Sequence, residues 1–137
     1  MGRYLVIAHQ TASGDTLRKH VARMVAETPE SEFVLVVPAT AVEDLTTWTE
    51  GQAKRAAEEA GEKARQAFAV DGVHIKEVII GDANPLYAIQ DAFMDDSYDA
   101  VIVSTLRTGI SRWLGMDLPA RAEKAVGVPV IHVESET

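Results

Sequence analysis

Short apolar segments alternate with amphipathic helical patterns along the chain, and this alternation constrains the fold more than any other feature of the sequence. Five segments are rich in β-branched residues: Tyr4–Ala8, Phe33–Val37, Val73–Ile80, Ala100–Val103 and Pro129–Val133. Several of them are apolar without a break, which is typical of strands that helices cover on both faces. The stretches between them are therefore expected to be helices that connect parallel strands.

Helix start and stop signals separate the first strands. The first helical pattern begins at Asp15, with Ser13 or Asp15 as the expected N-cap, and it stops before Pro29. The longest helix is predicted from near Thr49 to Ala69, where alanines form one small-residue stripe and charged residues form the opposite side.

The later helices carry clearer end signals. Asn84 followed by Pro85 predicts a cap with proline in the first turn. The last helix is predicted to begin at Asp117, with Pro119 in its first turn, and to end at Gly127.

Taken together, these elements predict an α/β fold. Five strands that alternate with four helices form a three-layer α/β/α domain around a five-stranded parallel sheet with right-handed crossovers. A chain of 137 residues has room for one such domain, so residues 1–137 are expected to form it. Ligands of open parallel sheets bind beyond the carboxyl ends of the strands, where the strand order reverses. This rule selects the loops after the first, second and fourth strands.

Charge and composition exclude several classes of function. A formal net charge of −8 argues against nucleic-acid binding, because lysine and arginine supply most of the affinity for phosphate backbones. No apolar run approaches the roughly 20 residues of a membrane span, so no membrane partner is expected. The absence of cysteine removes disulfides and thiolate chemistry, and it suits a reducing compartment. We expect a cytoplasmic protein.

The candidate ligand-binding residues lie in the three selected loops. The stretch after the fourth strand offers hydroxyl donors, glycines that permit close backbone approach, and arginines that pair with phosphate oxygens. The candidates are His9, Gln10 and Thr11 after the first strand, Pro38 at the end of the second, and Ser104, Thr105, Arg107, Gly109, Arg112 and Gly115 at the fourth. A nucleotide or another small anion fits these residues, and so does a purely structural loop in which the arginines pair with acidic side chains.

Catalysis has weaker support in the sequence. His9 with Ser13 or Ser104 could serve a small-molecule hydrolase or transferase, but nothing in the sequence places a base beside a nucleophile. No catalytic residue is therefore assigned.

The histidines do not indicate a metal site. None of the four, at positions 9, 20, 74 and 132, shares the three- or four-residue spacing that puts two ligands on one helix face. His74 and His132 fall inside predicted strands and are expected at a sheet edge or an interface.

Two stretches resemble the universal stress protein family, and the resemblance spans nearly the whole chain. "IIGDANPLYAIQDAF" is similar to the family's Gly-Asp-Pro stretch before its third helix, and "YDAVIVST" with "GVPVIHV" is similar to its fourth and closing strands. The resemblance implies a five-stranded parallel sheet and a homodimer formed through the last strand, here Val128 to Val133. In one subfamily it also implies ATP bound without a strongly catalytic site.

The chain departs from the family's nucleotide motif of Gly, two residues, Gly, nine residues, Gly, and Ser or Thr. Ser104 and Arg107 occupy the first two glycine positions. Gly115 matches the third only if the spacer shortens to seven residues, and Met116 then replaces the hydroxyl residue. His9 stands where the family has an aspartate at the end of the first strand.

Asp117 is a further departure, because it places a negative charge in the first turn of the last helix, where a triphosphate would otherwise benefit from the helix N-terminus. The resemblance and these departures together predict a non-catalytic binding or regulatory module, a homodimer with altered or lost nucleotide binding. The alternative is a stress protein that binds ATP or AMP and hydrolyses ATP slowly at most. ATP or AMP is the cofactor that the resemblance suggests, and the residues alone require none.

Overall fold

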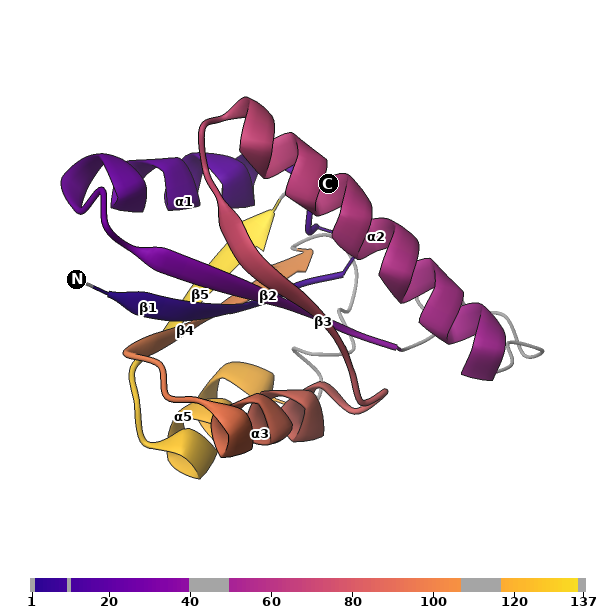
Figure 1. Ribbon diagram of the computed structural model, residues 1–137. Helices are drawn as coiled ribbons and strands as arrows, with labels where there is room; N and C mark the ends of the chain where they lie inside the picture. Colours follow the sequence, from indigo (N-terminus) through magenta and orange to yellow (C-terminus); the bar gives the residue numbers. More distant parts are fainter. Residues whose placement is uncertain (1, 10, 40–49, 107–116, 136–137) are drawn as a thin grey trace.

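The computed structural model describes residues 2–9, 11–39, 50–106 and 117–135. Strands and helices alternate along these residues, as Figure 1 shows. The elements in chain order are β1 (Arg3–Ile7), α1 (Asp15–Glu27), β2 (Glu32–Pro38), α2 (Glu50–Val70), β3 (Ile75–Gly81), α3 (Pro85–Asp95), β4 (Ala100–Leu106), α5 (Leu118–Val126) and β5 (Val130–Ser135). Within the described residues, no helix is long and apolar enough to cross a membrane.

The five strands form one parallel sheet in the order β3-β2-β1-β4-β5, so the predicted α/β fold is confirmed. Strand β1 is central, and its Ile7 pairs with Val36 of β2 on one side and with Val103 of β4 on the other. The chain builds outward from β1 to β3 and then returns to place β4 on the other side of β1. The strand order therefore reverses between β1 and β4.

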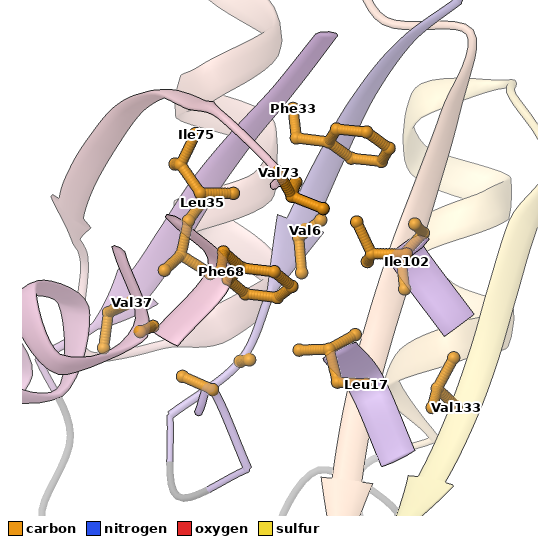
Figure 2. Packing of buried hydrophobic residues seen from close by; sticks show 14 of the residues in the cluster. Val6, Leu17, Phe33, Leu35, Val37, Phe68, Val73, Ile75, Ile102 and Val133 are labelled. Atoms are coloured by element: carbon orange, nitrogen blue, oxygen red, sulfur yellow. The ribbon is translucent and has the colours of Figure 1, made fainter. Parts of the chain in front are cut away.

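Helices cover both faces of the sheet. Helices α1 and α2 lie on one face, and α3 and α5 lie on the other (Figure 1). Because successive side chains of a strand point to opposite faces, Val6 and Ile102 join the core under α1 and α2, whereas Ile7 and Val103 join the core over α3 and α5. Figure 2 shows the first of these cores, which includes Phe68 of α2.

Helix α2 packs closely on the sheet through small residues. Ala57 and Ala64 are fully buried, which confirms that the alanine stripe faces inward. Gly61 lies between them, and a Cβ at this position would stand 2.6 Å from Cγ1 of Val78 on β3. A glycine is therefore required for the backbone of α2 to approach β3 this closely.

The structure corrects the predicted cap of the first helix. The N-cap of α1 is Gly14, with no side-chain cap bond, and Asp15 is the first helical residue, so neither Ser13 nor Asp15 caps it. The Gly14 N–H donates to the Thr11 carbonyl at 3.0 Å, and the backbone turn thus leads into the helix directly.

The other helix ends agree closely with the predictions. The Asn84 side chain caps α3 by accepting the backbone N–H groups of Leu86 and Tyr87. Helix α5 begins one residue after Asp117, which adopts a left-handed conformation, and Gly127 ends it.

Three strand boundaries differ from the predictions by two residues or more. Strand β3 begins at Ile75, so His74 precedes the strand instead of lying within it. Strand β4 continues three residues beyond Val103, and β5 continues to Ser135. The reason is that β4 and β5 keep pairing, with Ser104 opposite Val133 and Leu106 opposite Ser135. Ser104 and Thr105 are therefore strand residues, not loop residues.

Candidate ligand site at the carboxyl ends of β1 and β4

The candidate site lies where the strand order reverses. Strands β1 and β4 are neighbours and run in the same direction, so their carboxyl ends meet at one edge of the sheet. Ala8 and His9 follow β1, and Ser104 stands one residue beyond the last β1–β4 pair. The predicted position of the ligand site in the fold thus contains polar residues from both strands.

A pair of buried hydroxyl groups joins the two strand ends. Thr11 Oγ1 and Ser104 Oγ lie 2.5 Å apart, and the two residues are only 3% and 1% exposed. One hydroxyl donates its proton to the other, and the acceptor keeps its own proton for a further bond. The pair therefore offers a hydrogen-bond donor to a polar group at this edge of the sheet.

His9 adds a buried imidazole to the same edge. The residue is 7% exposed, and its Nε2 has no hydrogen-bond partner among the described residues. Burial lowers the pKa of the imidazole, so the ring is neutral at pH 7. A buried polar atom without a partner costs about 1–3 kcal/mol. A ligand that hydrogen-bonds to Nε2 would recover this cost.

Backbone turns hold His9 and Thr11 in place. The Ala12 N–H donates to the His9 carbonyl at 3.1 Å, and the Gly14 N–H donates to the Thr11 carbonyl at 3.0 Å. These two turns bring the chain from β1 to the start of α1 within a few residues.

Thr105 lies apart from this site. It is next to Ser104 on β4, so its side chain points to the opposite face of the sheet. There its Oγ1 lies 2.7 Å from Nε2 of His132 on β5. The structure thus divides the two predicted hydroxyl residues between two polar clusters.

Pro38 is buried at the carboxyl end of β2, where it pairs with Gly81 of β3. Among the described residues, no hydrogen bond or ion pair joins it to Thr11 or Ser104. The remaining candidates lie outside the described residues: Gln10, Arg107, Gly109, Arg112 and Gly115.

The geometry does not form a base–nucleophile pair at His9. Within the described residues, neither Ser13 nor Ser104 hydrogen-bonds to the Nε2 atom of His9. Ser104 bonds to a second hydroxyl instead, and a hydroxyl does not activate a nucleophile as an imidazole does.

Ser135 is a polar residue that sequence reasoning missed. Its Oγ is buried and has no hydrogen-bond partner among the described residues. Ser104 pairs with Val133, and Ser135 lies two residues further on, so Ser104 and Ser135 face the same side of the sheet. The sequence prediction ended the strand at Val133, and the polar character of the last two residues concealed the continued alternation.

Comparison with known proteins gives a consistent result at the level of fold. No protein-family model matches the sequence, and no curated protein matches it. A protein from the universal stress protein family of Burkholderia pseudomallei superposes with a TM-score of 0.65 at 11% identity, over 98% of this chain and 96% of that one.

Two structures of universal stress proteins with bound nucleotides are also similar. The Archaeoglobus fulgidus protein in complex with dAMP matches with a TM-score of 0.59 at 15% identity, over 97% of both chains. A family protein from Arabidopsis thaliana with AMP bound matches with a TM-score of 0.61 at 12% identity, over 100% of this chain and 94% of that one. The resemblance stated from the sequence is confirmed for the architecture: this chain has the universal stress protein fold.

Proposed function

We propose that this protein is a single-domain, non-catalytic binding and regulatory module of the cytoplasm that holds an adenine nucleotide, in an altered manner, at the carboxyl ends of β1 and β4. The observation that carries the proposal is that the buried Nε2 of His9 has no hydrogen-bond partner among the described residues. His9 follows β1 at the same edge of the sheet where Thr11 and Ser104 form their hydroxyl pair. Structures with the same fold contain dAMP and AMP, which supports this class of ligand.

The binding is altered because His9 stands where the resembled family has an aspartate at the end of the first strand. A neutral imidazole offers one ring nitrogen as a donor and the other as an acceptor, whereas a carboxylate only accepts. Nε2 therefore suits a neutral polar group of the ligand, such as a ribose hydroxyl or a base nitrogen. The lowered pKa keeps the ring from supplying a positive charge to a phosphate.

Asp117 favours a nucleotide with fewer phosphates. It precedes the first residue of α5, and its side chain is exposed. Its carboxylate offsets the partial positive charge of the helix N-terminus, which would otherwise stabilise a polyphosphate. We therefore infer that AMP binds more tightly than ATP.

Calorimetric titration tests this function. AMP is expected to bind the wild-type protein more tightly than ATP does, and His9→Ala is expected to weaken AMP binding by about tenfold, the effect of one lost hydrogen bond of about 1.4 kcal/mol. His74→Ala is the matched control, because His74 is exposed and precedes β3 at the other end of the sheet order. Equal affinity of the His9→Ala variant and the wild type would contradict the proposed role of His9.

We also propose a homodimer through β5, with its contacts in the segment Val128 to Val133. Strand β5 is an edge of the described sheet, and Val130 and Ile131 are only half-buried there. The opposite edge strand β3 carries the exposed charges of Lys76 and Glu77, which discourage edge-to-edge pairing. Sedimentation is expected to show a dimer at micromolar concentration, and a monomer would contradict this proposal.

A further inference from the structure

Three side chains form a polar cluster on the face of the sheet that carries α3 and α5. Thr105 Oγ1 lies 2.7 Å from Nε2 of His132, and Nδ1 of His132 lies 3.7 Å from Oε1 of Glu134. Thr105 is buried, whereas the His132 and Glu134 side chains are 24% and 45% exposed. The cluster thus leads from the interior of the sheet to its edge at β5.

The arrangement has the chemistry of half a metal site. His132 and Glu134 stand two residues apart on a strand, so both side chains point to the same face. Nitrogen and oxygen ligands about 2.1 Å from a tetrahedral zinc ion lie about 3.4 Å from each other. The observed 3.7 Å separation is longer than a hydrogen bond, but it needs only a small side-chain rotation to reach this value.

Thr105 accepts or donates the hydrogen bond that fixes the orientation of the His132 ring, as a metal-binding histidine requires. Metal-binding histidines hydrogen-bond through the ring nitrogen that does not hold the metal, which fixes the ring orientation and the tautomer. When Nε2–H of His132 donates to the Thr105 hydroxyl, the lone pair of Nδ1 points toward the Glu134 carboxylate. A cation between these two atoms removes the resulting repulsion.

The described residues of one copy do not complete the site. Among the described residues, no group of three or more potential metal ligands occurs, whereas a structural zinc ion binds four. Strand β5 is an edge of the described sheet, so a second copy can pair with it about a two-fold axis. The partner copy then contributes the missing two ligands.

The alternation of side chains limits the register of this pairing. In a continuous sheet, residues directly opposite each other face the same side, so a residue and its opposite must be separated by an even number of positions. Pro129 has no N–H to donate, which favours pairing centred further along β5. Centring the pair on Val133 places His132 of each copy opposite Glu134 of the other, with Cβ atoms about 5 Å apart.

We propose that two copies of this chain, paired through β5, bind one divalent cation of the zinc type with His132 and Glu134 from each copy. The inference rests on the dimerisation through β5 proposed above, with a register that centres the contacts on Val133 instead of spreading them over Val128 to Val133, and it is independent of the nucleotide site. Each chain has a formal charge of −8, and the cation offsets the electrostatic repulsion between the two Glu134 carboxylates that meet near the axis.

Sedimentation velocity with zinc chloride or with EDTA tests the site. Zinc is expected to lower the dissociation constant of the dimer by at least about tenfold, with one zinc ion bound per two chains. His132→Ala and Glu134→Gln are expected to abolish this effect, whereas His74→Ala retains it. Unchanged melting temperatures in EDTA verify that the variants fold. Cobalt in place of zinc is expected to give the visible absorption of a tetrahedral site.

The possible failures can be told apart. A dimer of equal strength with zinc and with EDTA would overturn the metal site and leave the β5 pairing intact. A zinc effect that survives in both His132→Ala and Glu134→Gln would also overturn it. A monomer under all conditions would overturn both the site and the pairing, while the calorimetric titration tests nucleotide binding separately.

Discussion

Two hydroxyl groups from distant parts of the chain meet in the interior at the candidate site. Thr11 and Ser104 are 93 residues apart in sequence, yet their side-chain oxygens lie 2.5 Å apart and both residues are buried. A buried hydroxyl without a partner is unfavourable, so each of these residues depends on the other. His9, whose Nε2 has no such partner, is the residue for which a ligand would matter most.

The first prediction concerns this mutual dependence. Ser104→Ala is expected to lower the free energy of unfolding by about 1–3 kcal/mol, because the Thr11 hydroxyl loses its partner. The double variant Thr11→Val/Ser104→Ala is expected to lose less free energy of unfolding than the two single variants lose together. The reason is that the double variant contains no buried hydroxyl without a partner. Urea unfolding of the wild type, the two single variants and the double variant measures these free energies. Additive losses of free energy would show that the two hydroxyls are not coupled.

The second prediction concerns pH and the buried imidazole of His9. Burial lowers its pKa in the folded chain, while in the unfolded chain it returns to about 6.5. The unfolded state therefore binds more protons, and the stability present above about pH 6.5 is lost as the pH falls through the lower folded value. His20 is shifted in the same direction, mainly by burial.

Urea unfolding at about pH 7.5 and about pH 5.5 checks this dependence. The wild type is expected to lose stability at the lower pH. His9→Gln is expected to lose less, with the remaining change attributable to His20 and to other groups. An identical loss in the wild type and in His9→Gln would contradict the assigned role of His9.

At the scale of elements, the strands and helices follow from local patterns, but their ends do not. Segments rich in β-branched residues predicted all five strands, and in several of them an unbroken apolar run reflects burial on both faces of the sheet. Ser104 and Thr105 are polar, and the sequence alone therefore assigned them to a loop. Each has a partner on its own face of the sheet, 93 and 27 residues away, and no local pattern carries that information.

The third prediction concerns the contact of α2 with β3. Gly61→Ala is expected to lower the free energy of unfolding by about 1–3 kcal/mol. The new methyl group would stand 2.6 Å from Val78 Cγ1, so the two elements would have to move apart. Gly51→Ala is the control: this residue is exposed in the first turn of α2, and alanine there is expected to be neutral or stabilising by up to about 1 kcal/mol. Thermal unfolding compares the two. Equal stability of the Gly61→Ala variant and the wild type would show that α2 has room to shift.

At the scale of the whole molecule, the sheet separates two polar regions. The hydroxyl pair of Thr11 and Ser104 belongs to the face under α1 and α2, whereas the cluster around His132 belongs to the face over α3 and α5. The alternation of β4 side chains produces this separation, since adjacent residues supply one hydroxyl to each region. Ligand binding at the first region and association of two copies at the second can therefore be tested by separate substitutions.

The proposed adenine-nucleotide site lies at the carboxyl ends of β1 and β4. An amide ¹H–¹⁵N spectrum recorded while AMP is added tests it most directly, because each residue reports on its own surroundings. The signals of His9, Thr11, Ala12 and Ser104 are expected to shift with a common saturation curve, while those of Ile75–Gly81 stay unchanged. No shifts at millimolar AMP, or shifts confined to residues outside the candidate site, would contradict it.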